Sequence, residues 1–300
     1  MKAMILAAGL GTRLLPYTLK RPKPLFPVLN KPLLHLTISR IRTAGFSEII
    51  VNCHHLRQQI IKALQYEKDC ILQEEKNVLG TGGGLRKAMV HFNRDPVLAV
   101  NGDIYHTINY QEVYQGHCAA GVDVTLVLQD YPRFNTITVD DTLMITGFNR
   151  SHTELDKKML AFTGIHVINP EVLKTISPDS PSCIIDCYRK LLDRGGTIRA
   201  HVAASHFWTD MGTPEDYLKL HAGLLKKKIP AYRELGETLA EAPFVGTRQT
   251  SLGRDVKFLD WACLGGGSII GAEATIERAI VWEGAQIPAK SIVRDVIVTD

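Results

Sequence analysis

The stretch MKAMILAAGLGTRLLPYTLKRPKP, residues 1–24, decides how the fold begins. Its apolar run at residues 3–8 ends at a glycine, which is typical of a buried strand in a parallel sheet. Directly behind that run come glycines, four basic residues and three prolines. Eight Lys or Arg precede the first acidic residue, Glu48. This local excess of positive charge predicts a site for a strongly anionic ligand.

Length and composition indicate a globular chain with neither a membrane nor a nucleic-acid partner. The 300 residues suffice for one large α/β domain, or for a domain with a small appendage. No apolar run reaches the roughly 18 residues that span a bilayer. The first residues are too short for a signal peptide, so we expect a cytoplasmic location. The net charge of +4 is too small for a nucleic-acid-binding face.

Two pairs of potential metal ligands have a simpler interpretation. Cys183 and Cys187 stand four apart and would share one face of a helix, where core packing is favoured over a metal site. His54 and His55 are adjacent, so their side chains would point apart on a strand or a helix. A turn after a strand is the favoured interpretation of the histidine pair.

Apolar runs alternate with segments of helical spacing over the first two thirds of the chain. This alternation predicts right-handed strand–helix–strand units, and therefore a mostly parallel sheet with helices on both faces. The expected strands are 3–8, 48–53, 70–73, 96–100, 123–128, 161–168 and 197–203, with a hairpin at 134–148. The expected helices are 33–44, 56–66, 81–91, 110–117, 184–194 and 214–226.

The pattern changes near residue 244. Residues 227–243 carry a lysine run, prolines and glycines and are interpreted as a connector. Over 244–300 apolar residues recur in a loose repeat of six, which predicts a short left-handed parallel β-helix of about three coils. In this register Ile270, Ile276, Trp282 and Pro288 align, as do Ala274, Ile280 and Gln286. An irregular β-rich tail is the alternative. Exposed edges of such coils also predict a homo-oligomer.

The glycine-rich turn behind the first strand has three possible interpretations. A dinucleotide fingerprint fails because Leu14 stands at its third glycine position and no acidic residue follows about 20 residues on. A Walker A motif is absent. The remaining interpretation is an anion-binding loop, in which backbone N–H groups of residues 9–12 surround a polyphosphate. Arg13 and Lys23 would then supply fixed positive charge.

These residues resemble the motifs of sugar-1-phosphate nucleotidylyltransferases, also called nucleotide-sugar pyrophosphorylases. The matching segments are GLGTRLLP at 9–16, PKPL at 22–25, LGTGGGL at 79–85, VNGD at 100–103, FTGIHV at 162–167 and FWTDMGTP at 207–214. One such motif is weak, but this series occurs in the family's order. The resemblance implies a Rossmann-like (GT-A type) catalytic domain over 1–226, followed by the connector and the β-helix.

The resemblance also implies a reaction and a set of site residues. The phosphate of a sugar 1-phosphate attacks the α-phosphorus of a nucleoside triphosphate, and pyrophosphate leaves. Arg13 and Lys23 are the expected catalytic residues, because charge neutralisation and positioning dominate phosphoryl-type transfer. The implied nucleotide-binding residues are Leu6, Ala8, Gly9, Gly11, Thr12, Arg13, Gly80, Thr81 and Gly82. The implied sugar-phosphate-binding residues are Asn101, Thr163 and Gly164.

Asp103 and Asp210 are the expected ligands of a Mg²⁺ cofactor. Both follow apolar strands, and the carboxyl ends of strands in an open α/β sheet form the ligand crevice. Two carboxylates with phosphate oxygens and waters suit the octahedral shell of Mg²⁺. For Glu74 and Glu75, contact with a guanine edge is one interpretation, but solvation of one or both is favoured.

The sequence departs from the family before the sugar-site strand. Many relatives carry Glu-Lys-Pro there, and its lysine grips the sugar phosphate; here Arg150, Lys157 or Lys158 could take its place. The substrate expectation is an enzyme like mannose-1-phosphate guanylyltransferases. The alternatives are an enzyme like N-acetylmuramate-1-phosphate uridylyltransferases, a non-catalytic regulatory homologue, and an enzyme acting on a non-sugar phosphate.

Overall fold

The computed structural model describes residues 1–148 and 158–299, and these residues form two compact units. Unit 1 comprises Met1–Leu10, Thr37–Ile104 and Ile108–Trp208. Unit 2 comprises Gly11–Leu36, Tyr105–Thr107 and Thr209–Asp300. The domain boundaries predicted at 226/227 and 243/244 rest on the change in the sequence pattern. The two units are instead divided by how their residues pack. The opening basic stretch and the C-terminal coils therefore belong to one unit.

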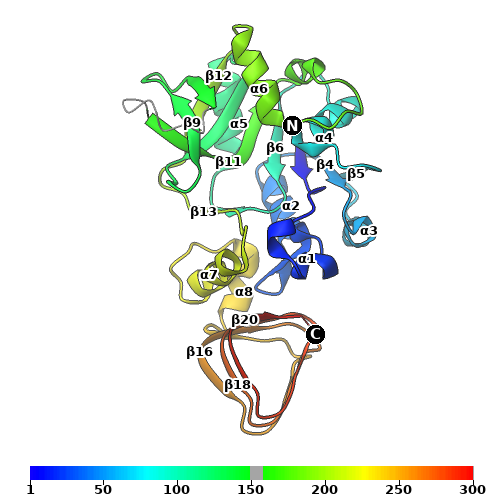
Figure 1. Cartoon of the computed structure of the whole chain (residues 1–300), viewed down its shortest axis with the longest axis vertical. Coiled ribbons are helices and arrows are strands. Elements are labelled where there is room, and N and C mark those ends of the chain that lie inside the picture. The colour runs from blue at the N-terminus through cyan, green and yellow to red at the C-terminus, as the bar shows by residue number, and fades with distance from the viewer. Residues whose placement is uncertain (149–157, 300) are drawn as a thin grey trace. The chain divides into compact units, whose positions relative to one another are not determined.

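Unit 1 is built on a nine-stranded sheet (Figure 1). Its strands are β1 (Lys2–Leu6), β4 (Glu48–Cys53), β5 (Cys70–Glu74), β6 (Val97–Asn101), β8 (Val124–Gln129), β9 (Asn135–Val139), β10 (Ile145–Phe148), β11 (Lys158–Ile168) and β12 (Ile198–Val202). Its helices are α3 (Arg57–Leu64), α4 (Gly80–Ala88), α5 (Tyr110–Ala120) and α6 (Ile184–Asp193), with 3₁₀ turns at Met89–His91 and Pro170–Thr175. Helix α2 (Leu33–Thr43) and strand β13 (Trp208–Thr209) cross the unit boundary.

The central strands run parallel in the order β6-β1-β4-β5, as the strand–helix alternation predicts. Strand β11 is antiparallel to β6, β8 and β9, and the predicted hairpin is present as β9 and β10. Parallel strands present their carboxyl ends at one edge, so the segments after β1, β4, β5 and β6 share that edge. The predicted nucleotide and metal residues of unit 1 lie at the ends of these strands or follow them.

The core of unit 1 explains why these segments form strands and helices. The apolar faces of α4 and α6 pack with residues of the sheet in one continuous cluster that includes Met4, Ala99, Leu126 and Tyr188. The central strands β1 and β4 are almost fully buried, which accounts for their apolar runs at 3–5 and 49–51. Cys187 lies in this cluster and is a free thiol, as the core-packing interpretation predicts. For Cys183 that interpretation is wrong, because this residue caps the N-terminus of α6 and is exposed.

Unit 2 contains short elements from the opening stretch and the whole C-terminal region. Its helical elements are α1 (Tyr17–Lys20), α7 (Pro214–Leu225) and α8 (Gly236–Leu239), with 3₁₀ turns at Thr12–Leu14, Lys23–Leu25 and Arg233–Leu235. Its strands are β2 (Pro27–Val28), β3 (Lys31–Pro32), β7 (Tyr105–His106), β14 (Phe244–Val245), β15 (Ser251–Leu252), β16 (Lys257–Leu264), β17 (Ile269–Ile270), β18 (Thr275–Val281), β19 (Gln286–Ile287) and β20 (Ile292–Val298). Helix α7 packs against β16, β18 and β20.

The C-terminal strands form a β-helix, visible in Figure 1 as stacked orange and red coils. Strands β14-β16-β18-β20 and β15-β17-β19 make two parallel stacks. Residues Phe244, Ala262, Ala279 and Val296 lie in register, so successive coils are 18, 17 and 17 residues long. Three repeats agree with the expected number of coils. The left-handed sense stays a prediction.

The predicted register of six is wrong after Ile276. Strand β16 has one more residue than β18 between the pairs Leu259–Glu277 and Ala262–Ala279, so the coils become one residue shorter from this point on. The interior positions shift by one from that point, and the interior cluster consists of Ala262, Leu264, Ile270, Ala274, Ile276, Ala279, Val281, Ala285 and Ile287. Ile280, Trp282, Gln286 and Pro288 are therefore not interior residues of the coils.

The segment 227–243 is more structured than a simple connector. It contains α8 and a 3₁₀ turn, and the ring of Tyr232 stacks on that of Tyr105 at 4.2 Å. Within the described residues, no helix has the length and apolar character needed to cross a membrane.

Candidate active site

In unit 1, a buried hydrogen-bond network joins the loop after β1 to the loop after β5. The Ala7 N–H donates to Asn52 Oδ1 at 2.7 Å, and Asn52 Nδ2 donates to Glu75 Oε1 at 2.7 Å. The Leu79 N–H donates to Glu75 Oε2 at 3.2 Å. Asn52 is 2% exposed and Glu75 is fully buried. The network therefore fixes the predicted phosphate loop relative to the predicted base loop.

This network decides between the interpretations of the two glutamates. Both Glu75 oxygens accept hydrogen bonds from within the protein, so its carboxylate is committed to holding the loop. Glu74 is exposed and lies 3.6 Å from Arg57, which agrees with the favoured interpretation that one glutamate is solvated. Sequence reasoning missed Asn52, although a polar residue inside the otherwise apolar run before Cys53 in the strand EIIVNC is a signal that could have been noticed.

The predicted base-binding glycines lie against the segment just before α6. Ser182 O accepts from the N–H groups of Gly82 and Gly83 at 2.9 and 3.3 Å. The Thr81 hydroxyl accepts from the Ile184 N–H at 3.0 Å. A Cβ on Gly80, whose φ is +69°, would lie 2.6 Å from Ser182 O. The glycines are thus needed for a close approach between two backbones, and they shape the base loop in that way.

The predicted sugar-site residues lie close together in unit 1. Leu6 and Asn101 are the last residues of β1 and β6 and are paired in register. A Cβ on Gly164, whose φ is +80°, would lie 2.4 Å from Asn101 Nδ2, so only glycine leaves room for that amide. The Thr163 hydroxyl donates to Val127 O at 2.8 Å and is buried. Asp103 is half-buried and follows β6 by two residues.

In unit 2, three of the predicted site residues form one charged cluster. Arg13 Nη2 donates to Asp210 Oδ2 at 3.2 Å. Lys23 Nζ donates to the backbone oxygen of Asp210 at 2.6 Å. The second carboxylate oxygen of Asp210 accepts from the Gly212 N–H at 3.1 Å. The Arg13 side chain is 57% exposed while Asp210 is 18% exposed, so the guanidinium still faces solvent. Residues 197 positions apart in the sequence are therefore in direct contact here.

The loop after β1, residues 8–12, contains a glycine whose backbone conformation other residues rarely adopt. Gly11 has a φ of +64°, and a Cβ there would lie 2.8 Å from Thr18 Cγ2. Gly11 O accepts from the Thr18 hydroxyl at 3.2 Å and from the Leu14 N–H at 3.0 Å. Ala8 and Gly9 belong to unit 1, whereas Thr12 opens a 3₁₀ turn in unit 2. A Cβ on Gly9 would meet no atom within 4 Å, so this position is open.

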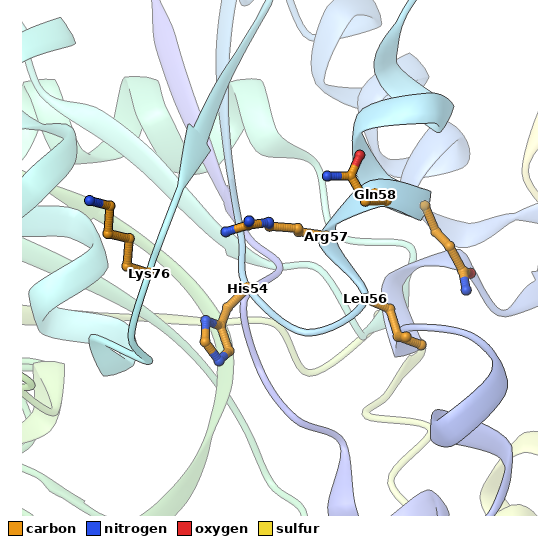
Figure 2. Close-up of a pocket in the computed structure, with 6 residues that line it drawn as sticks. His54, Leu56, Arg57, Gln58 and Lys76 are labelled. Atoms are coloured by element: carbon orange, nitrogen blue, oxygen red, sulfur yellow. The ribbon is translucent and has the colours of Figure 1, made fainter.

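A cavity of about 380 Å³ lies beside the ends of β4 and β5, and Figure 2 shows its lining. Lys76 reaches it from the loop after β5, and the other labelled residues come from the end of β4 and the start of α3. His54 Nδ1 donates to Glu75 O at 2.9 Å. His54 and His55 lie in the turn after β4, as expected. The cavity's lining includes none of the predicted site residues.

The carboxylate oxygens of Asp210 are the kind of hard ligand that Mg²⁺ prefers. Both oxygens accept hydrogen bonds here, one from Arg13 and one from the Gly212 N–H, so a bound ion would compete with these donors. Over residues 1–148 and 158–299, no group of three or more His, Cys, Asp or Glu side chains is arranged to hold a metal. The predicted site has only two protein ligands, Asp103 and Asp210, and so would not form a group of that size. Their role as Mg²⁺ ligands stays a prediction. Of the three candidate sugar-phosphate bases, Lys158 begins β11 and is exposed, whereas Arg150 and Lys157 lie outside the described residues.

Comparison with known proteins identifies the class of the chain. A family described as nucleotidyl transferase matches residues 2–227. The chain therefore belongs to the nucleotidyl transferase family. Within it, similarity to mannose-1-phosphate guanylyltransferases places the chain among sugar-1-phosphate nucleotidylyltransferases, as the motifs predict.

Two curated relatives illustrate the range of similarity. The putative mannose-1-phosphate guanyltransferase of Sulfolobus acidocaldarius is 30% identical over 76% of this chain, and the match spans 64% of that protein. The UTP–glucose-1-phosphate uridylyltransferase of Synechocystis is 25% identical over 96% of this chain and 84% of that protein. The chain thus spans less than two thirds of the first relative's length.

A solved structure supports the fold. The putative glucose-1-phosphate thymidylyltransferase of Bacillus anthracis superposes with a TM-score of 0.66 at 19% identity, covering 79% of this chain and 99% of that one. At this identity the likeness extends to the fold alone.

Proposed function

We propose that the chain transfers a nucleotidyl group from a nucleoside triphosphate to a sugar 1-phosphate. A phosphate oxygen of the sugar phosphate forms a bond to the α-phosphorus, and the bond from that phosphorus to the β-phosphate bridge breaks, so pyrophosphate leaves. The observation that carries the proposal is the cluster of Arg13, Lys23 and Asp210, supported by membership of the family.

The two cationic side chains of this cluster, Arg13 and Lys23, suit different roles in the reaction. Arg13 is largely exposed, and its planar guanidinium can spread over the charge of a leaving pyrophosphate. Lys23 is 6% exposed and tethered to a backbone oxygen, which suits a fixed point charge at the α-phosphate or the sugar phosphate. Fixed charges of this kind stabilise a transition state without reorganisation during the reaction.

Mg²⁺ is the proposed cofactor, with Asp103 and Asp210 as its proposed protein ligands. When bound, the ion would supply neutralising charge to the phosphates. Asp210 now pairs with Arg13, so ligation by its carboxylate would release or share the guanidinium. Removal of divalent ions with EDTA is expected to abolish turnover, and Mg²⁺ is expected to restore it.

Mannose 1-phosphate with GTP is the favoured substrate pair, because several relatives bear the name mannose-1-phosphate guanylyltransferase. A uridylyl donor is the second candidate, since one relative along nearly the whole chain is a UTP-dependent uridylyltransferase. N-acetylmuramate 1-phosphate with UTP belongs to this second candidate, because the missing Glu-Lys-Pro, the Thr163-Gly164 pair and the three successive glycines at 82–84 resemble N-acetylmuramate-1-phosphate uridylyltransferases.

The experiment is a grid of substrates. Pyrophosphate release is measured with Mg²⁺ for each NTP against mannose, glucose, N-acetylglucosamine and N-acetylmuramate 1-phosphates. We expect one NTP to be productive with one sugar phosphate. Nucleotide binding without pyrophosphate release across the whole grid would contradict the catalytic proposal and favour a regulatory homologue.

A further inference from the structure

Two adjacent residues of the β-helix contact the segment that carries Arg13 and Lys23. The indole ring of Trp282 packs edge-on against Phe26 with ring centroids 4.9 Å apart. The guanidinium of Arg21 lies 4.5 Å from the centre of the same indole and forms an ion pair with Glu283. Arg21 thus makes a cation–π contact and a charge-assisted pair with neighbouring side chains.

The register of the coils explains why Trp282 is available for this contact. The first of the two shorter coils places Val281 in the interior and turns Trp282 outward. Trp282 is nevertheless only 3% exposed, because residues of the opening stretch cover it. The indole of Trp282 therefore faces away from the interior of the β-helix and is covered by the opening stretch. We interpret this contact as one that holds the opening stretch in place.

The contact is connected to Lys23 through a short, stiff stretch of backbone. Lys23 lies between Pro22 and Pro24, whose rings fix φ and leave little freedom on either side. The Leu25 N–H donates to Pro22 O at 2.9 Å and the Phe26 N–H donates to Lys23 O at 3.0 Å, closing a 3₁₀ turn. Displacement of Arg21 or Phe26 would therefore move the ammonium group of Lys23.

A second contact holds the same segment from helix α7. The Tyr217 hydroxyl donates to Pro27 O, and the Leu29 N–H donates to His221 Nε2 at 3.2 Å. The rings of Phe26 and Tyr217 also lie 5.5 Å apart. Phe26 is therefore held by α7 and by the β-helix together, and it is fully buried.

We propose that Trp282 and Glu283 are positioning residues that fix Lys23, and with it the phosphate-neutralising cluster, through Phe26 and Arg21. The coil that carries Trp282 and Glu283 then contributes to catalysis by holding Lys23 in position. This inference rests on the proposed function, in which Lys23 acts on a phosphate.

The test compares Trp282→Leu and Glu283→Gln with two control variants. Glu273→Gln removes an equally exposed glutamate that lies 3.9 Å from Lys290 in the same β-helix. Ile276→Ala creates a cavity in the interior cluster away from the contact. For Trp282→Leu we expect kcat per folded molecule to fall about tenfold, and for Glu283→Gln about threefold. The KM for the NTP should change less than twofold, and both controls should retain the wild-type kcat.

Amide hydrogen exchange provides a readout that does not depend on activity. Loss of the contact should increase exchange at the Leu25 and Phe26 amides in both test variants and in neither control. If the wild-type protein turns over none of the substrate pairs, the proposed function fails, but exchange still tests whether the segment is held. Unchanged exchange together with kcat within twofold of wild type would overturn the inference. An equal loss in Ile276→Ala would also overturn it.

Discussion

At the scale of single residues, the Arg13–Asp210 pair combines weak stabilisation with an exposed cation. The two groups are 3.2 Å apart, but the guanidinium is more than half exposed, and pairs of this kind contribute about 0–1 kcal/mol to stability. The pair can therefore open without much cost to folding. This suits the proposed roles, in which the carboxylate and the guanidinium each meet a ligand.

Replacing Asp210 with Asn should separate catalysis from stability. The amide cannot bind a divalent cation as a carboxylate does, so we expect turnover to fall more than tenfold, or about 1.4 kcal/mol in the barrier. The free energy of unfolding should change by no more than about 1 kcal/mol. Initial rates and urea unfolding measure the two quantities. Asp260→Asn, which removes the partner of Lys226, serves as the control and should retain full turnover. A tenth or more of the wild-type rate in Asp210→Asn would refute the assigned role.

At the scale of elements, two of the three successive glycines of α4, Gly82 and Gly83, are required by packing against the segment 180–184, whereas Gly84 lies against the side chains of Asn52 and Glu75. A Cβ on Gly83 would lie 2.5 Å from Ser180 O, a backbone atom that cannot move away alone. Gly116 in α5 offers the opposite environment, because its added Cβ would meet no atom within 4 Å. The two glycines therefore make a matched pair in helices of similar length.

We expect Gly83→Ala and Gly116→Ala to change stability in opposite directions. Overpacking against Ser180 should lower the free energy of unfolding by about 1–3 kcal/mol. The exposed helical site should gain about 0.5–1 kcal/mol, since alanine restricts the unfolded chain and favours the helix. Denaturant unfolding measures the free energy of unfolding of both variants and of the wild type. If Gly83→Ala is as stable as wild type, the segment 180–184 does not pack on α4 as described.

Most elements could be predicted because their signals are local. The strand EIIVNC coincides with β4, and the helix expected at 33–44 is α2. The shift of register after Ile276 could not be predicted, because Val281 and Trp282 are both apolar and one missing residue leaves the pattern plausible. The motifs pointed to Arg13, Lys23 and Asp210 as site residues but not to the contacts among them, whereas the Asn52–Glu75 network depends on pairing between strands.

At the scale of the whole molecule, two buried histidines make stability depend on pH. Burial lowers the pKa of His166 to about 3 and that of His221 to about 4. His221 accepts from the Leu29 N–H through Nε2 and donates through Nδ1 to Tyr217 O, so it is neutral in the folded state. His166 Nδ1 pairs with the Tyr188 hydroxyl at 2.6 Å. Both rings must stay unprotonated in the fold.

Acidification should therefore destabilise the protein below pH 6.5. The unfolded histidines bind protons near their ordinary pKa of 6.5 whereas the folded ones do not, so the unfolded state takes up protons as pH falls. Each histidine then removes up to about 1.4 kcal/mol of stability per pH unit until its folded pKa is reached. Urea unfolding at pH 7.5, 6, 5 and 4.5 measures this slope. His221→Gln, whose amide can make both hydrogen bonds, should flatten it. Equal slopes in the variant and the wild type would contradict the neutral assignment.

The most direct measurement follows the phosphate oxygens of the sugar through the reaction. A sugar 1-phosphate labelled with ¹⁸O in its phosphate is incubated with the productive NTP and Mg²⁺, and both products are analysed by mass spectrometry. Attack of the sugar phosphate on the α-phosphorus predicts that all of the label stays in the nucleotide sugar and that pyrophosphate carries none. Label in pyrophosphate, or release of pyrophosphate without a nucleotide sugar, would contradict nucleotidyl transfer by this chain.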